Sequence, residues 1–193
     1  MHRYYGRPNP APAQSNFRCD GFLRDGRLHA ASGASIALAE LPPFLRALLV
    51  TDGTVTKILE AFFWEPVTVD TVEQRFEHAT AAVDWIAVGA GERCLVRDAR
   101  LRGNDSGRSF AEAFSLIRTD LIPADFRQRL IDREIGIGVL IRDSGLESYR
   151  EVLDVGLVED GATPSAVYRT YRIIIARRPV ILITEYFPLT LYR

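Results

Sequence analysis

The stretch YRIIIARRPVILITEYF, Tyr171 to Phe187, contains two apolar segments rich in β-branched residues, separated by the short run Ala176–Pro179. β-Branched residues pack well on a pleated sheet, and a short connection lets two consecutive strands pair antiparallel. We therefore expect two neighbouring strands here. The second segment stays apolar without alternation until Glu185, which predicts a strand covered on both faces.

The segments upstream repeat this arrangement. The sequence RCLVRDARLRG alternates between mainly apolar and mainly charged positions. It leads through the turn sequence GNDSG into a second candidate strand, SFAEAFSLIRT. Other segments have the apolar spacing of helices, and two of these begin at proline. The segment 144–156 fits either type. The expected elements are helices over 42–53, 54–63 and 123–132, and strands over 67–76, 93–103, 109–119 and within 171–187.

Strands in hairpins, with helices set between them, indicate an α+β fold with an antiparallel sheet. A chain of 193 residues can bury one sizeable core. We therefore expect a single domain over residues 19–193. Residues 1–18 are rich in Pro, Ala, Asn and Gln, which predicts a flexible N-terminal arm.

Composition argues against several function classes. The net charge of −1 provides no basic field for nucleic acid or an anionic membrane. No apolar run approaches the length of a membrane span. The cysteines, Cys19 and Cys94, and the scattered histidines have no metal-ligand spacing. We expect a cytoplasmic protein with free thiols, without a metal, and with no nucleic-acid or membrane partner.

Two charged residues lie where apolar residues are expected. Glu185 is in register with Ile181 and Ile183, and Arg97 shares the apolar parity of its strand. A buried charge is costly unless it is paired or hydrogen-bonded. From the pattern alone, a structural Arg97–Glu185 ion pair is the simplest interpretation. The alternative is a polar ligand held between them, since an arginine fork suits a carboxylate and a glutamate accepts a hydroxyl hydrogen bond.

The segment TDGTVT, residues 51–56, is a weaker candidate. Its backbone N–H groups at a helix start could bind an anion, although a helix capped by Thr54 explains the same residues. No phosphate-binding glycine motif and no nucleophile–histidine spacing is present in the sequence.

The chain resembles the chorismate pyruvate-lyases, in order, from about Leu41 to Phe187. The resemblance rests on the blocks LLVTDGTVTKILE, RCLVRDARL with AFSLIRTDLIP, GIGVLIRDSGLESYREV, and YRIIIARRPVILITEYF. The last block, with its TE followed by an aromatic residue, is the most specific. The chain is more similar to the bacterial branch that supplies specialised metabolism than to the ubiquinone-pathway enzymes.

This resemblance implies a single α+β domain whose helical flaps enclose the ligand. It implies removal of the enolpyruvyl group of chorismate as pyruvate, leaving 4-hydroxybenzoate, without metal or organic cofactor. It also implies a small-molecule substrate and, because one chain encloses the site, a monomer.

The family's site residues correspond to particular positions of this chain. The arginine that holds the ring carboxylate matches Arg97, and the glutamate that contacts the ring hydroxyl matches Glu185. Backbone groups of the remaining pocket match the block around Thr54, Val55 and Thr56 and the block around Ile137 and Gly138. We also expect the amides of 54–56 to receive the second carboxylate, and Glu185 either to assist proton movement or only to orient the substrate.

One position departs from the family pattern. Gly136 stands where the family usually has proline, which predicts a looser pocket-lining loop. Two other functions are compatible with the same sequence. One is a tailoring enzyme of the same fold that acts on another substrate in specialised metabolism. The other is a non-catalytic module that binds aromatic acids.

Overall fold

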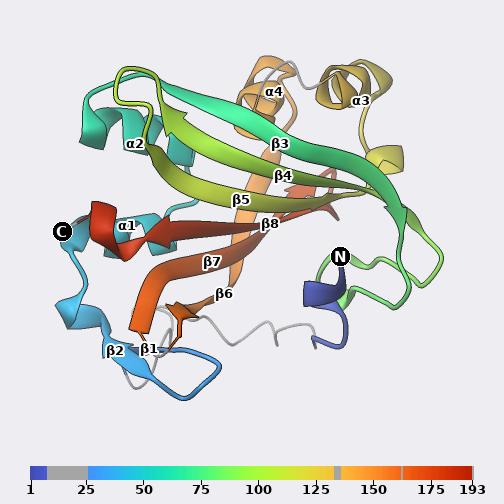
Figure 1. Cartoon of the computed structure of the whole chain (residues 1–193). Helices are drawn as coiled ribbons and strands as arrows, with labels where there is room; N and C mark the ends of the chain where they lie inside the picture. Colours follow the sequence, from blue (N-terminus) through green and yellow to red (C-terminus); the bar gives the residue numbers. More distant parts are fainter. Residues whose placement is uncertain (8–25, 133–135, 162, 193) are drawn as a thin grey trace.

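The computed structural model describes residues 1–7, 26–132, 136–161 and 163–192. The described residues form a six-stranded sheet, a separate two-stranded sheet and four α-helices (Figure 1). The strands are β1 (Arg27–His29), β2 (Ser35–Ala37), β3 (Val67–His78), β4 (Arg93–Gly103), β5 (Ser109–Ile117), β6 (Ser148–Asp160), β7 (Thr163–Ile175) and β8 (Arg178–Pro188). The helices are α1 (Pro43–Val50), α2 (Val55–Phe63), α3 (Ala124–Ile131) and α4 (Ile137–Asp143).

The large sheet has the order β3-β4-β5-β8-β7-β6, and every neighbouring pair is antiparallel. The chain's last strand, β8, therefore lies in the middle, between β5 and β7. A central strand is covered on both faces, which explains its continuous apolar run. The expected α+β class and antiparallel sheet are confirmed.

The hairpin of β7 and β8 is closed by only two residues, Ala176 and Arg177. Ile175 pairs with Arg178, and the two turn residues have φ values of 49° and 63°. Two consecutive positive φ values are the geometry of the tight turn that matches the twist of antiparallel strands. The turn sets the pairing of Ile174 and Ile175, and a register shift between Ile173 and Ile174 then sets the pairing of the rest of β8, in which Glu185 lies opposite Arg169.

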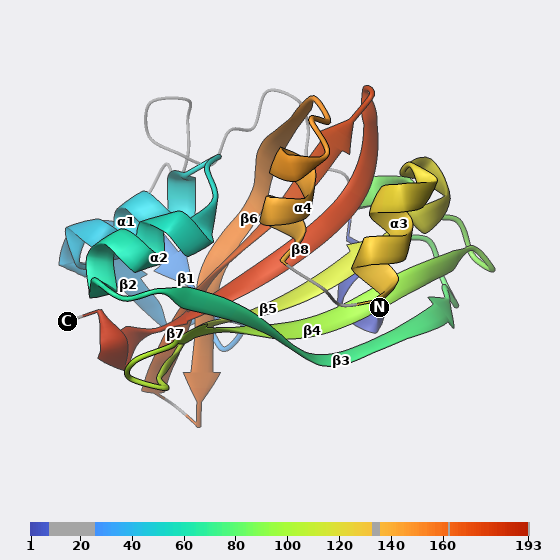
Figure 2. The ribbon, with the colours of Figure 1, turned by 90° about the horizontal axis from the view of Figure 1, so that it is seen from above.

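The helices cover one face of the large sheet. Viewed from above, α1 and α2 lie over one end of the strands, while α3 and α4 lie over the other (Figure 2). Apolar side chains of the helices and of the sheet face beneath them form two core clusters. A cavity lies on this face and is lined by residues of α2, α4 and the sheet.

The opposite face carries a third core cluster that includes the start of the chain. Met1 and Tyr4 are buried there, and the Tyr4 hydroxyl lies 3.0 Å from Thr184 Oγ1. Residues 1–7 are thus packed on the back of the sheet rather than forming the flexible arm expected for residues 1–18. The rest of that expected arm, residues 8–18, lies outside the described residues.

Two elements were left without a definite assignment from the sequence. Segment 144–156, which fits either type by pattern, contains the start of strand β6. Residues 137–143, which begin in the expected pocket-lining loop around Gly136, form the short helix α4. No described helix is both long and apolar enough to cross a membrane.

Candidate active site

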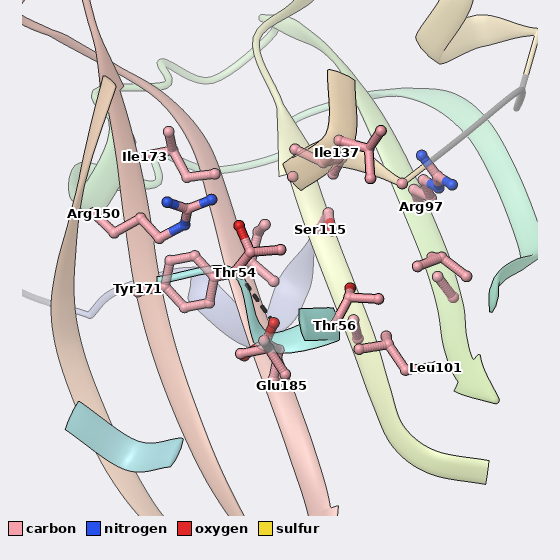
Figure 3. A pocket seen from close by; sticks show the side chains of 18 of the residues that line it. Thr54, Thr56, Arg97, Leu101, Ser115, Ile137, Arg150, Tyr171, Ile173 and Glu185 are labelled. Carbon is pink, nitrogen blue, oxygen red and sulfur yellow. Dashed lines mark hydrogen bonds between the residues drawn. The ribbon is translucent and has the colours of Figure 1, made fainter. Parts of the chain in front are cut away.

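A cavity opens between the helix-covered face of the sheet and the N-terminal ends of α2 and α4. All seven residues proposed from the sequence line this one cavity, although they come from four separate elements (Figure 3). The sheet supplies the charged groups, and the helix ends supply backbone groups. These residues are Thr54, Val55, Thr56, Arg97, Ile137, Gly138 and Glu185.

Glu185 lies on β8 with its carboxylate on the cavity side, and it is only 5% exposed. Its Oε2 accepts a hydrogen bond of 2.8 Å from Arg169 Nε, and its Oε1 accepts one of 3.1 Å from the Tyr171 hydroxyl. Among the described residues, Glu185 therefore forms its ion pair with Arg169. The Arg97–Glu185 pair that the pattern suggested is wrong, because β7, next to β8, supplies a nearer arginine.

Arg169 is fully buried and connects Glu185 to the segment before α2. Its Nη1 donates a 2.6 Å hydrogen bond to the carbonyl of Thr51, and its guanidinium lies over the Tyr171 ring, 4.7 Å from the centroid. Burial alone would lower the pKa of Arg169, but the negative charge of Glu185 and the hydrogen bonds to Glu185 and Tyr171 outweigh it and raise the pKa. The guanidinium therefore stays charged and fixes the glutamate in place.

Tyr171 is held neutral by the same surroundings. Burial, followed by the nearby negative charge of Glu185, raises the pKa of the Tyr171 hydroxyl above its ordinary value. The neutral phenol donates a hydrogen bond to Glu185 Oε1. Because each carboxylate oxygen has two lone pairs, Glu185 can still accept a hydrogen bond from a ligand.

Arg97 projects from β4 into the cavity at the side away from β7. It is 1% exposed, and its Nη2 donates a 2.6 Å hydrogen bond to Thr71 Oγ1 on the neighbouring strand β3. The register pairs Arg97 with Ser115, and Ser115 with Ile183. Arg97 and Glu185 therefore lie on the same face of the sheet, two strands apart, as the sequence parity predicted.

The N-terminus of α2 forms one wall of the cavity. Thr54 occupies the N-cap position, as expected, but its side chain makes no capping hydrogen bond. The amides of the first helical turn have no partner within a helix. Val55 and Thr56 supply two of these amides, and the helix dipole favours a negative group beside them.

The opposite wall begins at Gly136 and Gly138. A Cβ atom at Gly138 would lie 3.2 Å from Thr54 Cγ2 and 3.9 Å from Arg150 Nη2. The first distance is tight and the second is an ordinary contact, so the absence of a side chain at this glycine lets α4 approach Thr54 at the start of α2 closely.

Gly136 has φ and ψ values of −66° and 148°, which proline adopts without strain. A Cβ atom there would, however, lie 3.0 Å from Val69 Cγ2. The glycine at this position is thus explained by the neighbouring valine rather than by backbone conformation.

We expect Gly136→Pro to destabilise the protein, whereas the same change made in a Val69→Ala background stabilises it by about 0.4–1 kcal/mol through a less mobile unfolded chain. Urea unfolding of the four proteins of this double-mutant cycle measures both effects. Equal effects of Gly136→Pro in the two backgrounds would contradict the role of Val69.

Three residues of the cavity region were missed from the sequence. Arg169 and Tyr171 hold Glu185, and Arg150 of β6 lines the cavity opposite Arg97. Arg169 shares strand parity with Val167 and Tyr171. The signal that singled out Arg97, a charge on the apolar side of a strand, is therefore present at Arg169 too. Further apolar and hydroxyl side chains complete the lining, among them Val69, Leu101, Ser115, Ile173 and Ile183.

The sequence model of a protein family, described as chorismate pyruvate-lyase Rv2949c-like, matches residues 49–193. The chain belongs to this family. The match includes every predicted site residue, so the resemblance seen in the sequence blocks is confirmed.

Named relatives agree with this membership. The chain is 33% identical to a chorismate pyruvate-lyase of Mycobacterium leprae (strain TN) over 156 residues, 74% of this chain and 73% of that protein. It is 29% identical to a chorismate pyruvate-lyase of Mycobacterium tuberculosis (strain ATCC 25618 / H37Rv) over 163 residues, 77% of this chain and 81% of that protein.

Among solved structures, the effector domain of PhnF from Mycobacterium smegmatis is similar with a TM-score of 0.53. The similarity covers 70% of this chain and 88% of that domain at 14% sequence identity. At this identity the likeness shows a shared fold and nothing about activity.

Proposed function

We propose that this member of the chorismate pyruvate-lyase family eliminates pyruvate from chorismate and releases 4-hydroxybenzoate. The observation that carries the proposal is the meeting of Arg97 and Glu185 across one largely apolar cavity. A flat ring with a carboxylate at one end and a hydroxyl at the other fits between an arginine and a glutamate. The family membership and the names of the relatives support the same reaction.

The reaction needs positioning more than an activated nucleophile. The ether bond between ring C3 and the enolpyruvyl oxygen breaks, and C4 loses its proton. The electron pair of the C4–H bond becomes the new ring double bond, which completes the aromatic ring. The enolpyruvate takes up a proton and becomes pyruvate. Aromatisation provides the driving force, so the site has to hold the reactive conformer and stabilise the departing negative charge.

Arg97 is proposed to bind the ring carboxylate through two parallel hydrogen bonds, as an arginine fork favours. Its neighbour Thr71 fixes one side of the guanidinium. The first-turn amides at Val55 and Thr56 add positive potential on the same cavity.

Glu185 is proposed to accept the hydrogen bond of the 4-hydroxyl. Both of its oxygens already accept a hydrogen bond, one of them from a charged arginine. This fixed, ion-paired carboxylate suits the orienting role better than proton abstraction. We therefore assign it the task of holding the C4 carbon in a fixed position relative to the leaving group.

The direct test is incubation of the purified protein with chorismate. We expect pyruvate and 4-hydroxybenzoate to form in equal amounts, faster than in a protein-free sample that records spontaneous decay. Chromatography quantifies the aromatic product, and a coupled lactate dehydrogenase assay quantifies pyruvate. Absence of both products above the protein-free rate would refute the activity. Binding of 4-hydroxybenzoate without turnover would then favour the aromatic-acid-binding module.

A cavity lined by a single chain supports a monomer as the active unit. We place the enzyme in the cytoplasm, where chorismate is the expected small-molecule substrate, and assign its product to specialised metabolism.

A further inference from the structure

The cavity has a second arginine, Arg150, on the side opposite Arg97. Both line the same cavity, and the close view shows their guanidinium groups on opposite sides with Thr54 between them (Figure 3). Arg97 lies on β4 and Arg150 on β6, which are four inter-strand steps apart in the sheet order. At about 4.8 Å per step, the two strands are roughly 19 Å apart. Both arginine side chains are long and extend into the cavity, so the distance between their guanidinium groups is shorter and suits a small molecule.

The register places Arg150 on the ligand-facing side. Arg150 pairs with Ile173 of β7, and Ile173 lines the cavity. The next residue, Glu151, lies on the other side of the strand and forms its ion pair with Arg172 at 2.8 Å. The nearest carboxylate in sequence is therefore engaged elsewhere.

The contacts of Arg150 leave room for an anionic ligand. Its Nη1 donates a 3.0 Å hydrogen bond to the carbonyl of Asp52, which is a neutral acceptor. Within the part of the chain that the structure describes, no carboxylate forms an ion pair with it. Its positive charge nevertheless acts on Tyr171, the residue that holds Glu185.

We propose that Arg150 binds the second carboxylate of the substrate, the one on the enolpyruvyl side chain. This assignment rests on the proposed function and deepens it. In chorismate the ring carboxylate and the 4-hydroxyl lie at opposite ends of the ring, and the enolpyruvyl ether is attached next to the hydroxyl. With the ring spanning Arg97 and Glu185, the side chain leaves the ring beside Glu185 and extends toward β7 and β6. Arg150 lies there.

This role makes Arg150 a determinant of specificity. Chorismate has two carboxylates, whereas 4-hydroxybenzoate keeps only the one assigned to Arg97. Arg150 therefore favours the substrate over the aromatic product and stabilises the enolpyruvate as it departs. The amides at 54–56, which the sequence suggested for this carboxylate, then assist the arginine instead of acting alone.

The test compares one ligand that has the second carboxylate with one that lacks it. The first is 3-(carboxymethoxy)-4-hydroxybenzoate, an unreactive aromatic analogue, and the second is 4-hydroxybenzoate. Calorimetry measures the Kd of each for the wild type, Arg150→Gln and Arg150→Lys. Arg142→Gln, at an exposed arginine paired with Asp143, is the control. We expect Arg150→Gln to weaken binding of the dicarboxylate about tenfold or more, as loss of a charge-assisted hydrogen bond does. Binding of 4-hydroxybenzoate should change less than twofold.

Arg150→Lys keeps the charge and should recover part of the dicarboxylate affinity. Equal weakening of both ligands in Arg150→Gln would overturn the assignment, because it would show that the arginine acts only by holding the Asp52 carbonyl. Unchanged dicarboxylate binding would overturn it as well. These binding results do not depend on turnover. If the wild type discriminates as expected but releases no pyruvate from chorismate, the proposed function fails while the carboxylate site at Arg150 stands.

Discussion

Replacement of Glu185 by Leu is expected to abolish turnover of chorismate and to lower the free energy of unfolding by about 3–5 kcal/mol. The loss of activity follows from the loss of the only acceptor that we assign to the 4-hydroxyl. The loss of stability has a different cause, because Arg169 is fully buried and would keep its charge without its ion-pair partner. Urea unfolding and the chorismate assay measure the two effects on the same preparation.

A double variant separates these effects. In Arg169→Met/Glu185→Leu both charges are gone, and replacing a buried ion pair by apolar residues of similar size is often neutral for stability. We expect most of the lost stability to return, less the hydrogen bonds that Arg169 gives to Thr51 and Tyr171 gives to Glu185. Activity should stay absent. Recovery of turnover in the double variant would show that Glu185 is structural and not part of the site.

Replacement of Arg97 by Lys is expected to reduce kcat/KM for chorismate by roughly 100-fold, which corresponds to about 3 kcal/mol. Lysine keeps the charge but lacks the planar pair of donors that matches a carboxylate. Binding of 4-hydroxybenzoate should weaken in parallel, because its single carboxylate is the one assigned to this arginine. Steady-state kinetics with 4-hydroxybenzoate as inhibitor gives both quantities.

Arg100→Lys is the matched control for this change. Arg100 lies on the same strand but on the other face, with a side chain 55% exposed and 3.4 Å from Glu112. We expect its kinetics to match those of the wild type. An Arg97→Lys enzyme that keeps kcat/KM within threefold of the wild type would remove Arg97 from the carboxylate site.

The sequence predicted that Arg97 and Glu185 face the interior, because side chains alternate between the two faces along a strand without a bulge. No register shift interrupts Leu95 to Leu101 or Ile181 to Glu185, so the parity read from these residues holds. The partner of Glu185 depends instead on which strand lies beside β8, and this is decided by the sheet order. The local pattern does not give that order, so Arg97 was the only ion-pair partner proposed for Glu185 from the sequence.

Arg150 was missed for a different physical reason. A β-bulge between Val152 and Asp154 shifts the register of β6 against β7. Beyond a bulge, the alternation of inward and outward side chains changes phase. Segment 144–156 therefore shows no single period, and neither its strand character nor the face of Arg150 could be read from it. Helix α4 was missed because it is short and contains Gly138, which weakens helical propensity.

Arg169 donates hydrogen bonds both to Glu185 and to the carbonyl of Thr51, so it links the carboxylate of the site to the segment that precedes α2. The same guanidinium holds both, so the helix end cannot swing outward without releasing one arm of the arginine. Thr51 and Glu185, far apart in the chain, therefore belong to one cooperative unit. Any substitution that loosens the α1–α2 connection is expected to increase the disorder of the Glu185 side chain, even when the substituted residue does not contact the substrate. The geometry of the candidate site therefore depends on the contact between the α1–α2 connection and the sheet. Loss of this contact is expected to appear first as rapid amide exchange at the start of α2.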